Sequence, residues 1–131
     1  MSNIGLGPKR RTILLVDGDA HARAALRKVL EGAGFSVGEA CSAQEGERTA
    51  LRILPDAILT DLMVETIYAG HEIADRLRAA GHEIPLYVVS AAADALVGAV
   101  SFKELGISGV FLKPIDAAIV VQTLKTRLGA A

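Results

Sequence analysis

The stretch Ile13-Leu14-Leu15-Val16-Asp17-Gly18-Asp19-Ala20 (ILLVDGDA) decides the fold that we expect for this chain. Its first four residues are all apolar, and a short apolar run without alternation is typical of a strand buried on both faces of a parallel sheet. The run stops at two carboxylates separated by a glycine. Either these carboxylates only start the helix that follows, where aspartate is a preferred N-cap, or one of them lines a cation site.

Apolar runs and helical segments then alternate along the whole chain. Apolar runs predict strands at residues 12–16, 35–40, 57–60, 86–90 and 109–112. Apolar residues at helical spacing predict helices at residues 20–33, 43–53, 72–80, 95–105 and 116–128. This alternation is typical of βα units, whose parallel sheet is covered by helices on both faces. We therefore expect an α/β fold, a (βα)5 three-layer sandwich around a five-stranded parallel sheet.

The composition is that of one globular domain. The chain has 131 residues, of which 51% are hydrophobic and 22% charged, so we expect a sizeable core rather than a disordered chain. We expect residues 1–10 to be an N-terminal extension and residues 11–129 to be a single domain. The net charge of -1 lacks the basic excess that nucleic acids and anionic membranes attract, so neither is expected as a direct partner.

The sequence contains a single cysteine, Cys41, which we expect to be a small buried residue. An intramolecular disulfide is therefore impossible, and a reducing compartment, the cytoplasm, is the natural expectation. The most apolar tract, residues 84–102, is interrupted by Pro85, Ser90 and Asp94. These interruptions favour a strand, a loop and a helix over a membrane span.

Polar residues stand where four of the predicted strands end. They are Asp17, Asp61, Ser90 and Lys113. Functional groups of open parallel sheets collect at the carboxyl ends of the strands, so we expect these four side chains to share one edge. A carboxylate there can attack phosphorus and form an acyl phosphate. A hydroxyl, an ammonium and a divalent cation can stabilise the transferred group, and Mg²⁺ prefers a few carboxylates together with water and substrate oxygens.

Four segments, in order and at fitting separations, resemble the receiver domains of two-component response regulators, over about residues 11–128. They are ILLVDGDAHAR, PDAILTDLM, YVVSA and GVFLKPID. The resemblance implies a flavodoxin-like fold with strand order 2-1-3-4-5. It implies that Asp61 is the phosphoacceptor, that Asp17, Asp61 and the backbone carbonyl of Met63 hold Mg²⁺, and that Ser90 and Lys113 contact the phosphoryl group. It also implies a cis bond between Lys113 and Pro114.

The same resemblance implies a signalling protein rather than an enzyme. Its phosphodonor would be a histidine kinase or a phosphotransfer protein. Its output face, and a homodimer contact, would be formed by residues 95–105, the strand 109–112 and the last helix. The residues that we expect on this output face are Leu96, Val97, Val100 and Val110. The alternative is that the apolar residues of the helix 95–105 only form a wide core face.

Three positions depart from the pattern of the family. Gly18 replaces a second acidic metal ligand, so we expect Mg²⁺ binding to be weakened by about one to two decades, the worth of a charge-assisted contact. Asp19, one position later, either caps the helix or contacts the metal. Glu65 stands where proline is usual, and we expect it to be solvated. Val110 takes the place of the aromatic switch residue, and Phe111 should face the opposite side of the strand.

These departures leave two functions open. The chain is either a phosphorylated receiver or a divergent pseudo-receiver that acts as a phosphorylation-independent interaction module. A flavodoxin-like cofactor binder is disfavoured, because no flavin-phosphate loop rich in Ser or Thr follows the first strand.

Overall fold

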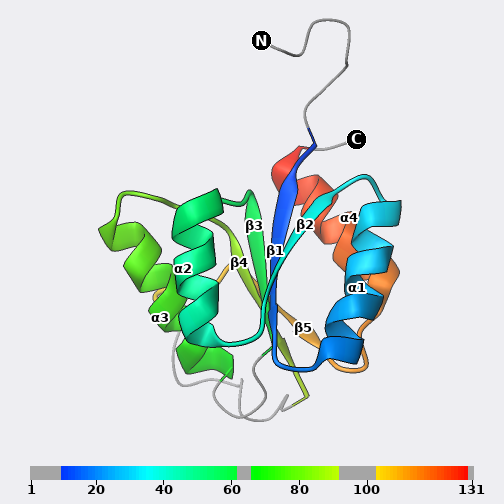
Figure 1. The fold of residues 1–131 in the computed structure, drawn as a ribbon, viewed down its shortest axis with the longest axis horizontal. Helices are drawn as coiled ribbons and strands as arrows, with labels where there is room; N and C mark the ends of the chain where they lie inside the picture. The colour runs from blue at the N-terminus through cyan, green and yellow to red at the C-terminus, as the bar shows by residue number, and fades with distance from the viewer. Residues whose placement is uncertain (1–9, 62–65, 92–102, 130–131) are drawn as a thin grey trace, which may run out of the picture.

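The computed structural model describes residues 10–61, 66–91 and 103–129. These residues form a parallel five-stranded sheet in the order β2-β1-β3-β4-β5 (Figure 1). The strands are β1 (Thr12–Asp17), β2 (Ser36–Ala40), β3 (Ala57–Asp61), β4 (Leu86–Ser90) and β5 (Gly109–Leu112). The helices are α1 (Ala20–Gly32), α2 (Ala43–Ile53), α3 (Thr66–Ala79) and α4 (Ala117–Leu128). The predicted fold class and strand order are confirmed.

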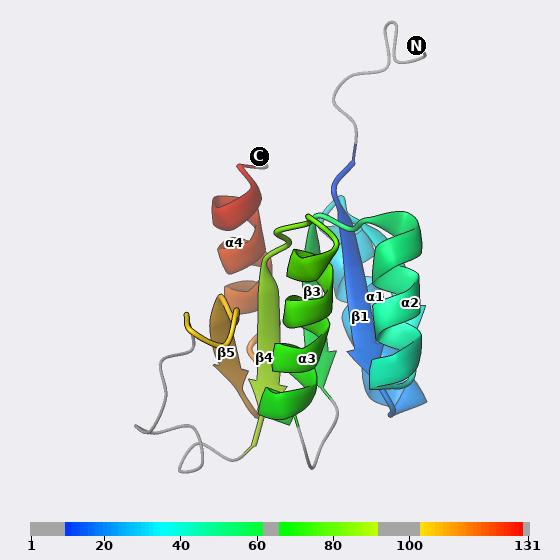
Figure 2. The same cartoon turned by 90° about the vertical axis from the view of Figure 1, so that its left-hand side faces the viewer.

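Helices cover the sheet on both faces, with α2 and α3 on one side and α1 and α4 on the other (Figures 1 and 2). Successive residues of β1 therefore enter different cores. Leu14 and Val16 pack in the core under α2 and α3, whereas Ile13 and Leu15 pack in the core under α1 and α4. All four side chains are at most 2% exposed. Burial on both faces is the physical reason for the unbroken apolar run in the sequence.

Short polar side chains start three of the helices. Asp19 caps α1, Ser42 caps α2 and Asp116 caps α4, each accepting backbone N–H hydrogen bonds from the first turn. After α1 the chain passes through Gly34 with a φ of 100°, a conformation that favours glycine. Among the described residues, the helices are all too short or too polar to cross a bilayer.

Helix α3 begins at Thr66, whereas the sequence pattern predicted a start at Glu72. The predicted start is wrong because a glycine such as Gly70 is typical of a loop, and here it is part of the helix. Gly70 lies inside the helix, where an added Cβ would meet Val88 Cγ2 at 3.0 Å and Leu86 Cδ2 at 3.2 Å. The missing side chain lets α3 approach β4 closely, so this glycine serves packing and not a turn.

Two further expectations differ from the structure or fall partly outside it. Most of the predicted helix 95–105 lies outside the described residues, and residues 103–106 form turns. Cys41, which we expected to be buried, is exposed in the turn between β2 and α2. Its backbone N–H donates to Glu45 Oε1 at 2.7 Å, so the position is used by the turn and not by the core.

Thr60, near the end of β3, is fully buried, and its hydroxyl has no hydrogen-bond partner among the described residues. Burying an unpaired hydroxyl opposes folding. We expect Thr60→Val, which keeps the shape of the side chain, to raise the free energy of unfolding by about 1 kcal/mol. Thr60→Ser, which keeps the hydroxyl and removes a buried methyl group, should lower it by about 1 kcal/mol. Urea denaturation measures both. A valine variant less stable than the parent would show that the hydroxyl is satisfied.

Candidate functional site

Two carboxylates lie side by side where β1 and β3 end. Asp17 and Asp61 are partners in the register of these two parallel strands, which places them on adjacent strands about 4.8 Å apart. Asp61 is only 8% exposed, and Asp17 is half-buried. A cavity of about 30 Å³, the room of roughly one water molecule, is lined by both carboxylates and mostly apolar side chains. Two partly desolvated acids in contact range form an anionic centre at this edge.

Lys113 brings a positive charge to this centre. Its Nζ lies 2.7 Å from Asp61 Oδ2. The backbone fixes this lysine, because β4 and β5 pair Ser90 with Leu112 and the Lys113 N–H donates to the Ser90 carbonyl at 2.9 Å. Ser90 itself ends β4 and is only 8% exposed. The Lys113–Pro114 peptide bond is cis, as the resemblance implied.

The environment of Asp17 disfavours its ionised form. Burial raises the pKa of the Asp17 carboxyl above its ordinary value of 3.8, and the negative charges of Asp61 and Asp19 raise it further. The hydrogen bond from the Asp19 N–H and the charge of Lys113 act in the opposite direction. The net direction is upward, because removal from water and nearby like charges both penalise the carboxylate. A cation placed beside Asp17 would relieve this penalty.

Asp19 is used as the N-cap of α1. Its Oδ1 accepts from the N–H groups of His21 at 2.9 Å and Ala22 at 3.2 Å. These two hydrogen bonds lower the pKa of the Asp19 carboxyl, since they stabilise the charged form. The Asp19 N–H in turn donates to Asp17 Oδ1 at 2.8 Å and so orients that carboxylate. Of the two roles left open by the sequence, the structure shows the capping role.

Arg23 is a residue that the sequence reasoning missed. Its Nη1 donates to the Asp17 carbonyl at 2.6 Å, and its Nε donates to Glu39 Oε1 at 2.7 Å. Arg27, one helical turn later, also pairs with Glu39. Hydrogen bonds from both arginines lower the pKa of the Glu39 carboxyl, and the bond from Arg23 has the larger effect. The sequence signal was the basic pair at i,i+4 spacing on α1, which faces the end of β2.

The described side chains offer few ligands for a hydrated magnesium ion. Asp17 and Asp61 supply two adjacent carboxylates, and Mg²⁺ is commonly held by one or two carboxylates with waters and substrate phosphate. Within the described ranges, no three His, Cys, Asp or Glu side chains form a cluster that could hold a metal. Gly18, which the resemblance marks as an acidic position, offers no ligand. Two carboxylates and a phosphoryl oxygen remain compatible with the ion.

Five of the residues singled out in the sequence lie outside the described residues, namely Met63, Glu65, Leu96, Val97 and Val100. The structure does place Val110.

Val110, on β5, is half-buried and packs against the core under α2 and α3. Phe111 packs on the opposite face, where its ring stacks on Tyr87 with centroids 5.4 Å apart. The prediction that Phe111 faces the other side of the strand is confirmed. An aromatic ring is therefore absent from the Val110 side of this strand.

The family model described as "Response regulator receiver domain" matches residues 13–125. The chain is 31% identical over 116 residues to the transcriptional regulatory protein PrrA of Mycobacterium leprae, an alignment that covers 88% of this chain and 49% of that protein. It is 35% identical over 79 residues to the response regulator MprA of the same organism, covering 60% and 34%. The chain thus spans at most about half the length of these relatives.

Solved structures resemble the whole fold. A crystal structure described as a response regulator from Chloroflexus aurantiacus superposes with a TM-score of 0.76 at 29% identity, covering 92% of this chain and 99% of that one. The receiver domain of a sensor histidine kinase from Pseudomonas aeruginosa superposes with a TM-score of 0.75 at 24% identity, covering 93% and 100%. That second structure holds a magnesium ion in its active-site cleft, and its likeness to this chain concerns the fold.

The raised pKa of Asp17 predicts a pH dependence of folding. In the folded protein the pKa of the Asp17 carboxyl lies above the ordinary value of 3.8. The contribution of this group to the free energy of unfolding is therefore fully present below pH 3.8 and is lost as the pH rises through the raised pKa. Asp17→Asn keeps an oxygen acceptor for the Asp19 N–H but carries no charge. We expect this variant to be more stable than the parent at pH 7 in the presence of a chelator, and equally stable at pH 3.

Thermal or urea unfolding across this pH range measures the difference. Asp75→Asn, at an exposed position of α3, is the matched control and should change little. A parent protein more stable than Asp17→Asn at pH 7 without metal would contradict the electrostatic account.

Proposed function

Because the chain belongs to the response regulator receiver domain family, we propose that it accepts a phosphoryl group on Asp61 and passes the resulting change to a partner protein. The observation that carries this proposal is the convergence of three strand ends on one carboxylate. Lys113 Nζ lies 2.7 Å from Asp61 Oδ2, and Asp17 is the register partner of Asp61. A buried carboxylate beside an ammonium and a second acid suits the transfer of an anionic group.

In the proposed reaction, a carboxylate oxygen of Asp61 attacks the phosphorus of a phosphohistidine on a histidine kinase or a phosphotransfer protein. The new O–P bond forms as the P–N bond breaks, and the electron pair returns to the imidazole nitrogen. Lys113 then neutralises charge on the phosphoryl oxygens from its position next to Asp61. Ser90, at the end of β4, would donate its hydroxyl to a phosphoryl oxygen. Hydrolysis of the acyl phosphate by water would break the O–P bond, release inorganic phosphate and regenerate Asp61, so the modification would be a reversible signal.

Magnesium would be held by Asp17, Asp61 and the backbone carbonyl of Met63. When bound, it supplies positive charge that offsets the charge of the phosphoryl group. The protein contributes the alignment. Asp17 is oriented by the Asp19 N–H at 2.8 Å, and its carbonyl is held by Arg23 at 2.6 Å. Gly18 supplies no acidic ligand, so we propose that the metal site is weak. Phosphorylation would therefore require a high magnesium concentration.

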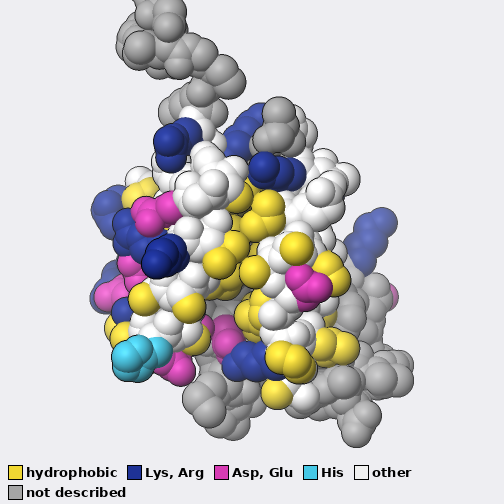
Figure 3. Space-filling view, turned by 90° about the vertical axis from the view of Figure 1, so that its right-hand side faces the viewer, with side chains coloured by type: hydrophobic (Ala, Val, Ile, Leu, Met, Phe, Trp, Pro, Cys, Tyr) yellow, Lys and Arg dark blue, Asp and Glu magenta, His cyan; other side chains and the backbone are white. Residues whose placement is uncertain are grey.

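The proposed output face comprises residues 95–105, β5 and α4, and it would contact a partner protein or a second copy of the chain. Two large apolar side chains support this proposal, Leu112 on β5 at 51% exposed and Ile119 on α4 at 55% exposed. Hydrophobic side chains also gather between α1 and α4 on the face shown in Figure 3. Leu96, Val97 and Val100 are further proposed members of this face. We also propose a cytoplasmic location for the protein.

A phosphorylation-independent interaction module is the second candidate function. It is favoured by Gly18 at an acidic position and by Val110, which packs into the core where an aromatic switch would act. Under this alternative the Asp61–Lys113 pair would be a structural feature of the edge, and partner binding would not depend on Asp61.

Phosphorylation is tested directly with a small phosphodonor such as acetyl phosphate across a magnesium series. We expect intact mass spectrometry to show one added phosphate, with a yield that rises with magnesium. Asp61→Ala should abolish the gain. Asp56→Ala, which changes an aspartate at the opposite end of the sheet, should keep it. No gain at any magnesium level, together with partner binding that survives Asp61→Ala, would favour the interaction module.

Restoring the missing acid tests the metal site. A Cβ on Gly18 would lie 3.5 Å from the Cys41 carbonyl oxygen, an ordinary contact, so a side chain fits there. We expect Gly18→Asp to tighten Mg²⁺ binding by about ten- to a hundredfold, as one added charge-assisted contact implies. Calorimetric titration measures the affinity. Gly32→Asp, which adds the same charge at the far end of α1, is the control, and equal tightening in both variants would refute a local effect.

A further inference from the structure

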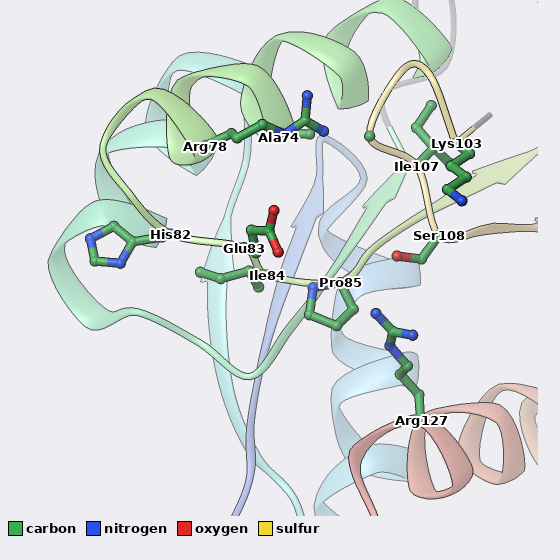
Figure 4. Close-up of a pocket in the computed structure, with 11 residues that line it drawn as sticks. Ala74, Arg78, His82, Glu83, Ile84, Pro85, Lys103, Ile107, Ser108 and Arg127 are labelled. Atoms are coloured by element: carbon green, nitrogen blue, oxygen red, sulfur yellow. The ribbon is translucent and has the colours of Figure 1, made fainter. Parts of the chain in front are cut away.

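A second cavity lies at the opposite edge of the sheet from Asp61. It has a volume of about 520 Å³ and is lined by the end of α3, the segment that leads into β4, the turn before β5 and the end of α4 (Figure 4). Pro85 precedes β4, and Ser108 precedes β5. The cavity therefore touches the amino ends of the two strands that carry Ser90 and Lys113 at their other ends. Nothing in the proposed phosphorylation uses it.

Positive charge dominates the lining. Arg78, Lys103 and Arg127 are all cationic lining residues, whereas Glu83 is the one carboxylate among them. In the part of the chain that the structure describes, none of these three cations has a carboxylate within 4.0 Å, in contrast to Arg23 and Arg27 of α1. Three cations from three different segments thus line one space with a single carboxylate, and none of the three forms an ion pair with a described residue.

Arg78 is exposed, and its guanidinium lies against the turn before β5. Its guanidinium lies over Gly106, where an added Cβ would stand 2.5 Å from Arg78 Nη2 and 2.9 Å from Ala74 Cβ. Gly106 has a φ of 76°, so glycine is favoured there for its backbone as well as for this space. The absence of a side chain at Gly106 therefore leaves room for the Arg78 guanidinium at the wall of the cavity.

The remaining lining is partly apolar. Ile84, Pro85 and Ile107 form a hydrophobic portion of the wall. In Figure 4 the guanidinium of Arg127 points from α4 toward Pro85, and the hydroxyl of Ser108 points into the same space. Apolar walls with a few convergent polar groups, at a volume of 300 to 1,000 Å³, are typical of sites for small organic ligands.

We propose that this cavity binds a phosphorylated small molecule of about nucleotide size. The phosphate groups would contact Arg78, Lys103 and Arg127, since guanidinium and ammonium groups are the usual partners of phosphate. The organic part would rest on Ile84, Pro85 and Ile107. Glu83 would accept a hydrogen bond from a hydroxyl or amino group of the ligand. The site is separate from Asp61, because the full length of β4 stands between them.

The test uses the full chain and three probes, adenosine diphosphate, inorganic pyrophosphate and adenosine, in calorimetric titrations at low ionic strength, where screening is weak. We expect saturable binding that weakens in the order adenosine diphosphate, pyrophosphate, adenosine. Arg127→Gln and Lys103→Gln should each weaken binding of the diphosphate about tenfold or more. Both side chains are exposed, so both variants should fold, and thermal unfolding checks this.

Two controls locate the binding. Arg52→Gln removes an exposed arginine of α2 that does not line the cavity and should leave the affinity unchanged. Asp61→Ala should also leave it unchanged, which separates this site from the phosphorylation site with its own cation, Lys113. The proposal is overturned if neither phosphate probe binds up to about 1 mM, the upper end of common small-ligand affinities. It is equally overturned if the two cavity variants bind as the parent does, or if adenosine binds as tightly as the diphosphate.

Discussion

The register between parallel strands is the constraint on which the site depends. Asp17 faces Asp61 because β1 and β3 pair residue by residue, and Lys113 follows Leu112, the partner of Ser90. A shift of one residue in any of these pairings would turn one functional side chain toward a core. The cores prevent such a shift, since alternate residues of β1 are fully buried under different helix pairs. The packing of apolar side chains therefore sets the distances between the polar ones.

The site carries unfavourable electrostatics that the rest of the fold tolerates. Asp17 is partly removed from water and stands next to the negative charge of Asp61, so its carboxyl resists ionisation. Two groups oppose this tendency. The Asp19 N–H donates to the carboxylate, and the positive charge of Lys113, which pairs with Asp61, favours its ionised form. An arrangement of this kind is expected at functional sites, where groups with perturbed pKa values gather. A transferred phosphoryl group and its cation would complete the charge balance.

Much of this architecture could be predicted from the sequence, because unbroken apolar runs and strand-end polar residues follow directly from a parallel sheet covered on both faces. The N-cap role of Asp19 and the opposite facing of Phe111 also follow from local rules. The start of α3 could not be predicted, since the role of Gly70 depends on how closely the helix approaches β4. Arg23 was missed for a similar reason, because its contact with the Asp17 carbonyl joins a helix, a turn and a strand end. The seat of Arg78 over Gly106 likewise exists only in three dimensions.

In the proposed function, the carboxylate at the end of β3 is the nucleophile toward phosphorus. The most direct measurement is reductive trapping with borohydride after exposure to a phosphodonor at saturating magnesium, followed by peptide sequencing by mass spectrometry. Borohydride converts an aspartyl phosphate to homoserine, so the modified position is identified by its mass. We expect homoserine at position 61, with aspartate retained at position 17. Homoserine at another position, or unmodified aspartate at position 61 under all conditions, would rule out Asp61 as the phosphoacceptor.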